Sequence, residues 1–419
     1  MALSFPDGAV RVTPVDGVDD PDALSLAAIL DADHLDSALA TSYVLDLDWL
    51  VSHLHPRTRL TLIADQIQHA TTDPSSYTVV DPELPQPDVQ LVHSKLLLLF
   101  YPQHMRLVVS TANLTPDEWS LVHNCIYLHD FPRDATRVFA ANRFSLELAQ
   151  ALHDLSVPFD IVASMNHVDF ARATAVRVVT SVPSAVDARR PRRNANMPSY
   201  GMLRLAQVLA PEQDSNEIEF VPDARLLCVG SSMGRLDANW LRDFYLCAHA
   251  RDPRVWTLEE RAQLVPDDLV DVAVAFHTQS QVEDNRGGMS AAGYVNCARS
   301  IIDARGFPQS SLFKLVPRTD RVLVHAKAIV ARLGEQQRHG WLYVGSHNFT
   351  PAAWGRLNQN AQPYINNYEF GLVLSPVLFE CREINRIKAV RWNRQLVPLP
   401  FEPVWHPYKR DDKPYCSRE

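Results

Sequence analysis

One pattern of residues occurs twice in this 419-residue chain, and the two copies lie about 230 residues apart. Residues 91–95 read Leu-Val-His-Ser-Lys and lead into an aliphatic run, and residues 323–327 read Leu-Val-His-Ala-Lys before a similar run. After a short turn, each copy continues with a second β-rich segment, which ends in Asn-Leu-Thr-Pro or Asn-Phe-Thr-Pro. Each copy is therefore typical of a β-hairpin. A twofold repeat at this distance predicts two duplicated domains rather than a solenoid, which needs several shorter repeats.

Each copy carries a histidine, a lysine and an asparagine in the same order. Residues i and i+2 of a strand point to the same face, so the histidine and lysine of each copy are predicted to project together. The asparagine ends the partner strand and is predicted to join them. With 16 histidines and six lysines in the chain, chance gives about 0.23 His-x-Lys pairs, so two pairs in matching contexts predict one shared site. The six residues are His93, Lys95 and Asn113 in the first copy and His325, Lys327 and Asn348 in the second.

Composition is that of an ordinary globular protein, with 46% hydrophobic and 21% charged residues. The longest strongly apolar run, residues 96–101, is far shorter than the ~20 residues of a membrane-spanning helix. The N-terminus lacks the pattern of a signal peptide. Six cysteines are scattered without a Cys-x-x-Cys pair, which favours free thiols over disulfides or a zinc site. We therefore expect a soluble intracellular protein with no membrane partner.

The net charge of -9 is unevenly distributed. Residues 1–50 hold ten Asp and a single basic residue, Arg11, and thus account for the whole net charge, so the remainder is neutral. That remainder contains a cationic run from Arg189 to Arg193. Because local fields steer polyanions, nucleic acid stays a candidate partner. The same run is equally typical of a solvated charge cluster or a nuclear-import signal.

The residue types of the repeated motif suit phosphoryl chemistry. Two lysines supply fixed positive charge and two amides supply directed donors for the oxygens of a phosphate. Imidazole titrates near neutrality, so one histidine suits a nucleophile and the other a general acid and base. No cluster of Asp, Glu or Cys accompanies the motifs, which disfavours metal-assisted hydrolysis. The motifs predict phosphodiester cleavage through a phosphohistidine, without metal or cofactor.

The paired motifs resemble the phospholipase D superfamily, whose usual signature is His-x-Lys-x4-Asp. This chain has Phe100 and Arg332 at the two Asp positions. A His-x-Lys pair with a downstream Asn instead resembles the tyrosyl-DNA phosphodiesterase family, type 1. The residues at 43–51, 230–234, 348–355 and 367–371 resemble it too, and the similarity runs from about Arg11 to the Pro-rich C-terminal end.

This resemblance implies an α/β fold of two similar mixed-sheet α-β-α sandwich domains, related by pseudo-two-fold symmetry. We expect the domains to span residues 1–185 and 186–419, with the active site at their interface. His93 would be the nucleophile and His325 the general acid and base. Lys95, Lys327, Asn113 and Asn348 would bind the phosphate. Glu369 matches the family glutamate that orients the nucleophile, although a solvated carboxylate at a strand end is an alternative.

Further positions follow from the same resemblance. The family glutamine that orients the second histidine corresponds to Asn124, which is one methylene shorter. Tyr43 and Ser232 fall where the family touches the DNA backbone. An aromatic residue that stacks on a DNA base is replaced by Val89, so stacking of ~1–3 kcal/mol per base would be weaker or supplied elsewhere.

The expected function is DNA repair in the nucleus: hydrolysis of the bond between a DNA 3′-phosphate and a topoisomerase I tyrosine, and of other 3′-blocking adducts. The expected partners are DNA with blocked 3′ ends and a topoisomerase I-derived peptide, and the protein is expected to be a monomer. Two alternatives remain. One is a phospholipase D-like nuclease or lipid phosphodiesterase, and the other is a catalytically silent protein that binds DNA ends.

Overall fold

The computed structural model describes residues 3–184, 199–210, 224–334, 336–358, 361–383 and 386–417. The cationic run from Arg189 to Arg193 lies outside the described residues, as does the expected domain boundary between residues 185 and 186.

The first half of the chain forms a mixed sheet, which has seven strands within the described residues. Its order is β1-β8-β7-β6-β2-β3-β4, in which β2, β3 and β4 are parallel and the other neighbours are antiparallel. The strands are β1 (Ala9–Val12), β2 (Ser37–Asp46), β3 (Arg59–Gln68), β4 (Tyr77–Val79), β6 (Leu96–Phe100), β7 (His104–Ser110) and β8 (Cys125–Pro132).

The second half forms a larger mixed sheet in the order β12-β11-β10-β13-β14-β17-β18-β19, with β5 and β9 also paired to β17. The order β17-β14-β13-β10-β11-β12 repeats β8-β7-β6-β2-β3-β4 with the same parallel and antiparallel neighbours. The strands are β5 (Leu91–Val92), β9 (Val176–Ser181), β10 (Arg225–Val229), β11 (Val272–Phe276), β12 (Leu312–Lys314), β13 (Ala328–Leu333), β14 (His339–Gly345), β17 (Asn367–Glu383), β18 (Arg386–Trp392) and β19 (Gln395–Leu396), and β15 (Arg356–Leu357) pairs with β16 (Pro363–Tyr364) apart from both sheets.

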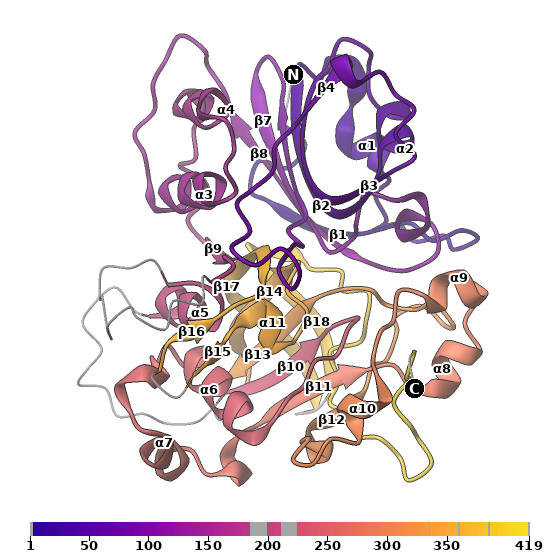
Figure 1. The fold of residues 1–419 in the computed structure, drawn as a ribbon, viewed down its shortest axis with the longest axis vertical. Helices are drawn as coiled ribbons and strands as arrows, with labels where there is room; N and C mark the ends of the chain where they lie inside the picture. Colours follow the sequence, from indigo (N-terminus) through magenta and orange to yellow (C-terminus); the bar gives the residue numbers. More distant parts are fainter. Residues whose placement is uncertain are drawn as a thin grey trace.

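Helices cover the sheets (Figure 1). Around the first sheet, α1 (Leu26–Leu30) and α2 (Leu47–Ser52) lie on one side, and α3 (Arg143–Asp154) and α4 (Phe159–Ser164) lie on the other. Against the second sheet, α5 (Gly201–Leu209) and α6 (Ala238–Ala248) pack together with residues of α9 (Gly288–Ala292) and α10 (Arg299–Ile302). The remaining helices are α7 (Leu258–Leu264), α8 (Gln279–Glu283) and α11 (Pro351–Trp354).

Strand β6 shows why the aliphatic runs fold as they do. Leu96, Leu98 and Phe100 face the core shared by the two halves, whereas Leu97 and Leu99 face α1 and α2. Because both faces of the strand are buried, the run lacks polar alternation. Both predicted hairpins are present, as β6–β7 and β13–β14.

The histidine and lysine of each motif occupy a different place from the one predicted. His93 and Lys95 lie in the segment between β5 and β6, and His325 and Lys327 lie just before β13, rather than inside the strands. Asn113 and Asn348 follow the ends of the partner strands β7 and β14, as expected. Each His-x-Lys segment is thus an irregular stretch of backbone that precedes a strand. It lies at the same end of the sheet as its asparagine.

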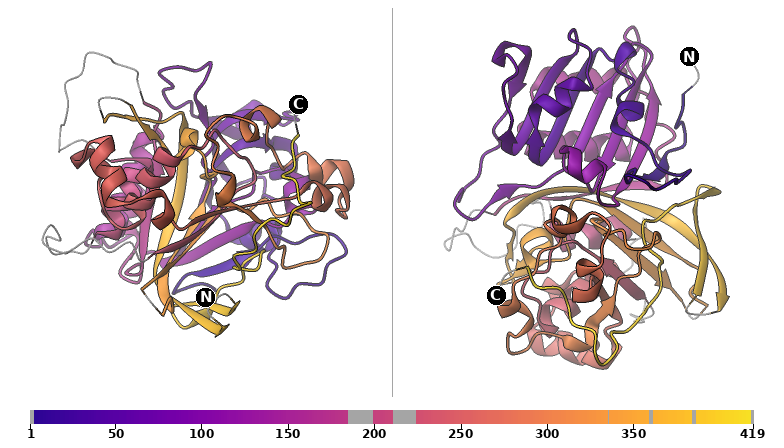
Figure 2. Two further views of the ribbon diagram at one scale, coloured as in Figure 1. Left: turned by 90° about the horizontal axis from the view of Figure 1, so that it is seen from below. Right: turned by 90° about the vertical axis from the view of Figure 1, so that its right-hand side faces the viewer.

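The two halves are joined by one hydrophobic core and by backbone hydrogen bonds. Apolar residues from the facing sides of both sheets form a single buried cluster, and the two sheets lie one above the other in Figure 2. Strand β5 of the first half pairs with β17, and β9, which precedes the expected domain boundary, also pairs with β17. These crossings fix the orientation of one half against the other.

Two glycines leave room for the fully buried side chain of Tyr343 near the second motif. Gly345 of β14 pairs with Gly371 of β17, and a Cβ on Gly371 would lie 2.1 Å from the Tyr343 hydroxyl oxygen. The Tyr343 hydroxyl contacts His347 Nδ1, and His347 Nε2 lies 3.0 Å from Ser181 Oγ. This buried arrangement supports the turn that carries Asn348.

We predict that Gly371→Ala destabilises the fold, because the added methyl group collides with the Tyr343 ring in a fully buried site. Overpacking of this kind typically costs about 1–3 kcal/mol. The measurement is the midpoint of urea-induced unfolding. Gly293→Ala is the matched control, because its Cβ would meet nothing closer than 3.4 Å. Equal midpoints for the two variants would contradict this account.

Candidate active site

A cleft of about 980 Å³ opens between the two halves. Its lining includes residues of both motifs and both expected DNA contacts: Tyr43, His93, Asn113, Ser232, His325 and Asn348. Lys95, Lys327, Asn124 and Glu369 lie buried beneath this lining. The structure therefore brings every predicted site residue to one cleft.

His93 is held by the second half of the chain. Its backbone N–H donates to Tyr368 O at 2.9 Å, and its Nδ1 lies 2.8 Å from Glu369 Oε2. Glu369 also accepts hydrogen bonds from Ser346 Oγ and from Asn367 Nδ2. A carboxylate at Nδ1 favours the tautomer that carries its proton there, so Nε2 keeps a free lone pair. The alternative for Glu369, a solvated carboxylate at a strand end, is not what the structure contains, since its side chain is fully buried.

Burial lowers the pKa of His93, and Glu369 opposes that shift. Burial alone would raise the pKa of Glu369, but the neighbouring charges, above all His93, hold this pKa at about 2. At neutral pH the pair is therefore a carboxylate beside a neutral imidazole, which is the form that a nucleophilic nitrogen requires.

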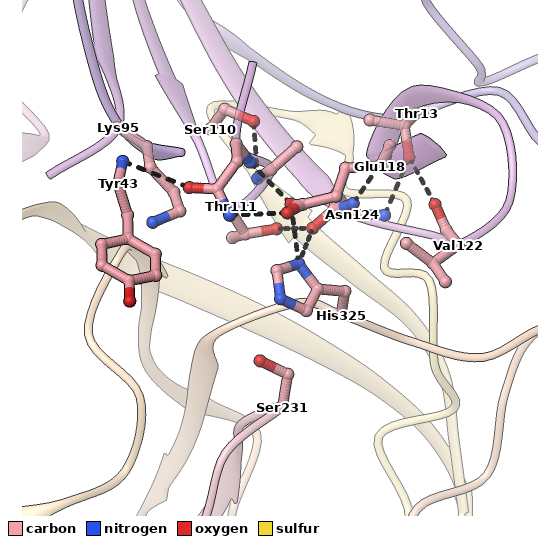
Figure 3. A network of polar contacts seen from close by, with 12 residues as sticks. Thr13, Tyr43, Lys95, Ser110, Thr111, Glu118, Val122, Asn124, Ser231 and His325 are labelled. Atoms are coloured by element: carbon pink, nitrogen blue, oxygen red, sulfur yellow. Dashed lines mark hydrogen bonds and ion pairs between the residues drawn. The ribbon is translucent and has the colours of Figure 1, made fainter. Parts of the chain in front are cut away.

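His325 is held by the first half of the chain in a similar way (Figure 3). Its backbone N–H donates to His123 O at 2.8 Å. Its Nδ1 lies 3.1 Å from Asn124 Oδ1 and equally 3.1 Å from Glu118 Oε2. Lys327 Nζ lies 2.9 Å from Nε2 and 3.0 Å from Nδ1 of the same ring. Burial together with the charge of Lys327 lowers the pKa of His325 to about 4.

Both motif lysines are buried under the cleft floor. Lys95 Nζ donates to His93 O at 2.9 Å, and Lys327 Nζ donates to His325 O at 2.8 Å and to Thr111 O at 3.1 Å. Burial lowers the pKa of Lys95 to about 8 and that of Lys327 well below its usual range. Among the described residues that line the cleft there is no Lys or Arg, so the lysines of this site are these two buried groups.

Asn113 is oriented by a neighbouring loop and by a carboxylate. Its Oδ1 accepts from the backbone N–H groups of Tyr43 at 3.2 Å and Val44 at 3.4 Å. Its Nδ2 donates to Glu118 Oε1 at 2.5 Å. These contacts fix the amide plane at the edge of the cleft.

Asn348 has the matching arrangement in the second half. Its Oδ1 accepts from the backbone N–H groups of Ser231 and Ser232, both at 3.1 Å. The oxygen is thus turned toward this loop, which leaves the amide nitrogen as the group available for a ligand in the cleft. Ser232, an expected DNA contact, is therefore placed by the same asparagine.

Aromatic rings flank both histidines. The Tyr43 ring lies 5.4 Å from the His93 ring, and the Tyr294 ring lies 5.6 Å from the His325 ring. Val89, which stands where the stacking aromatic was expected, lines the cleft mouth and is 54% exposed.

Sequence reasoning missed two residues of this site, Glu118 and Tyr294. Glu118 lies in a short 3₁₀ helix (Pro116–Trp119), five residues after Asn113, and nothing in the sequence separates it from its neighbour Asp117. The corresponding place in the second copy is Ala353, so the repeat gives no signal for it. Tyr294 comes from the segment after α9, far from either motif.

Two kinds of functional element are absent from the described residues. No group of three or more His, Cys, Asp or Glu side chains is arranged to hold a metal ion there. Within the same part of the chain, every helix is too short or too polar to cross a membrane.

Comparison with known proteins identifies the family. A family model described as "Tyrosyl-DNA phosphodiesterase" matches residues 9–413. The alignment with tyrosyl-DNA phosphodiesterase 1 of Arabidopsis thaliana is 471 residues long, with 24% identity. It covers 97% of this chain and 73% of that protein. The Drosophila melanogaster protein of the same name is 24% identical over 425 residues, covering 94% of this chain and 70% of that protein.

The crystal structure of the yeast tyrosyl-DNA phosphodiesterase superposes with a TM-score of 0.73 at 17% identity, and the match covers 98% of this chain and all of that chain. This likeness confirms the expected α/β fold of two phospholipase D-like domains. Together with the family match over nearly the whole sequence, it shows that the chain is a phosphodiesterase of the hydrolase class and belongs to the tyrosyl-DNA phosphodiesterase family.

Proposed function

We propose that this chain hydrolyses the phosphodiester bond between a DNA 3′-phosphate and a tyrosine of a topoisomerase I-derived peptide, and related adducts that block 3′ ends. The names of its relatives support the tyrosyl–DNA bond as the substrate. The observation that carries the mechanism is that His93 and His325, one from each half, face the same cleft.

In the first step, His93 Nε2 attacks the phosphorus and forms a P–N bond while the P–O bond to the tyrosine breaks. Glu369 holds the proton on Nδ1 of His93, so that the attacking nitrogen has its lone pair. His325 donates a proton to the departing tyrosyl oxygen. In the free protein the pKa of His325 is about 4, and the negative charge of a bound phosphodiester favours its protonated form.

In the second step, a water molecule attacks the phosphohistidine. His325 accepts a proton from the water, an O–P bond forms, and the P–N bond to His93 breaks. The products are a DNA 3′-phosphate and free His93. One histidine thus stays attached to phosphorus between the steps, and the other transfers a proton in each direction.

Electrostatic stabilisation comes from the residues under and beside the phosphate. Lys95 and Lys327 supply positive charge in a buried setting, where an ion interacts more strongly than in water. The amide nitrogens of Asn113 and Asn348 donate to the phosphate oxygens. Tyr43 and Ser232, on opposite sides of the cleft, contact the DNA backbone.

The cellular role we propose is removal of blocking groups from DNA 3′ ends during DNA repair. The enzyme would act like a 3′ exonuclease that removes a single terminal group. We propose the nucleus as the compartment in which it acts. A monomer suffices, since both motifs of the site come from one chain.

We predict that the protein converts a labelled 3′-phosphotyrosyl oligonucleotide to a 3′-phosphate product. A plain 3′-hydroxyl oligonucleotide and a phosphatidyl lipid in vesicles, tested at the same enzyme concentration, should react far more slowly. The measurement is product formation by gel and by lipid chromatography. Faster turnover of the lipid would contradict the proposed substrate, and equal turnover of both oligonucleotides would indicate a general nuclease.

We predict that cleavage is unaffected by excess EDTA, because Lys95 and Lys327 occupy the place beneath the phosphate where a divalent cation would otherwise supply charge. Initial rates with EDTA and with added Mg²⁺ are the comparison. An activity that chelation abolishes and Mg²⁺ restores would rule out the mechanism proposed here.

We predict that His325→Asn accumulates a covalent protein–DNA adduct, whereas His93→Ala forms neither adduct nor product. The tyrosyl leaving group has a conjugate-acid pKa near ~10, so the first step proceeds without full protonation. Water is a far poorer nucleophile without a base, so loss of His325 slows the second step more. A denaturing gel with labelled 3′-phosphotyrosyl DNA separates the species.

The reverse pattern, with an adduct in His93→Ala and none in His325→Asn, would mean that the two roles are interchanged. Turnover by both variants without any adduct would contradict covalent catalysis.

A further inference from the structure

Glu118 is a buried carboxylate directly behind His325 (Figure 3). Its Oε2 lies 3.1 Å from His325 Nδ1 and accepts from the Asn113 backbone N–H at 2.6 Å, while its Oε1 accepts from Asn113 Nδ2 at 2.5 Å. The side chain is 2% exposed. Both oxygens are therefore fixed, and one of them contacts Nδ1 of His325, while both residues line the cleft.

Asn124 is the other acceptor at His325 Nδ1, and its contacts point to a supporting role. Its Oδ1 already accepts from Thr111 Oγ1 at 2.8 Å, and its Nδ2 donates to the backbone oxygen of Glu118 at 3.0 Å. An ionised carboxylate is a stronger acceptor than a neutral amide oxygen at equal distance. Asn124 thus anchors the short helix that carries Glu118, and the carboxylate is the stronger partner of the imidazole.

The charged groups around His325 explain what this carboxylate does. The charges of Lys327 and Lys95 both disfavour a positive charge on the His325 ring, whereas the charge of Glu118 favours it. The Tyr294 ring packs edge-on against the same imidazole. Burial alone would raise the pKa of Glu118, but His325 and the two lysines hold it below its usual range, so the carboxylate is ionised.

We infer that Glu118 is the positioning residue of the general acid and base: it keeps the Nδ1 proton of His325 in place, directs Nε2 into the cleft and stabilises the imidazolium that forms when His325 takes a proton from water. This inference rests on the proposed function. It gives the site two His–Glu pairs, each made across the boundary between the halves: His93 with Glu369 and His325 with Glu118.

The test begins with Glu118→Gln, which keeps the shape and removes the charge. We expect hydrolysis of the adduct to slow by about 10- to 1,000-fold, so that adduct accumulates, with little change in KM. Glu369→Gln is the matched control, because it should slow adduct formation instead and leave no accumulation. Asn124→Ala should have the smaller effect, and Glu118→Asp should recover part of the rate.

A double variant separates action through His325 from a general structural effect. In the His325→Asn background, Glu118→Gln should cause no further slowing, because its target is already absent. An equal slowing in both backgrounds would overturn the inference. So would a change confined to KM, which would assign Glu118 to Asn113 and phosphate binding.

A measurement without DNA keeps the inference separate from the proposed function. Nitrogen-15 NMR of the wild-type protein at neutral pH should find the proton of His325 on Nδ1, and a proton on Nε2 would overturn the inference even if Glu118→Gln fails to fold. If His325→Asn forms no adduct while the Nδ1 tautomer is found, the proposed mechanism fails and the Glu118–His325 contact stands.

Discussion

The arrangement of the rest of the site depends on two lysine side chains buried beneath the cleft. Lys95 and Lys327 are almost completely removed from solvent, and an unpaired buried charge costs several kcal/mol or more. Two equally buried carboxylates, Glu118 and Glu369, balance them. Each carboxylate also binds the histidine of the opposite half, so charge balance and ring orientation depend on the same contacts.

Backbone hydrogen bonds also join each histidine to the opposite half of the chain. The N–H of His93 bonds to Tyr368 and that of His325 bonds to His123, so each histidine is fixed by the half that does not contain it. The shared hydrophobic core and the pairing of β5 and β9 with β17 hold the halves in this register. Separation of the halves would expose the core and break both histidine contacts together, which makes the site a property of the whole fold.

The sequence was enough to predict the duplicated hairpins and the convergence of both motifs, because the repeated pattern fixes strand pairing on each side. Glu369 was also predicted as a site residue, from the family resemblance. His93 and Lys95 were wrongly predicted to lie within a strand: β6 begins only at Leu96, and the apolar residues Leu91 and Val92 form β5, which pairs with β17. Glu118 could not be predicted: its role depends on which half faces it, and a local pattern does not contain that information.

The location of positive charge has a consequence for how the proposed DNA substrate would be held in the cleft. Within the described part of the chain, the cleft lining has no Lys or Arg and includes the carboxylates of Asp46, Asp117 and Glu118, while the two motif lysines lie buried beneath it. Each further phosphate contact would otherwise add to affinity and to its salt dependence. For the DNA ends proposed as substrate, the described lining of the cleft then adds no cationic contact along the strand, so its hold on the substrate depends on the terminal phosphate rather than on the length of the strand.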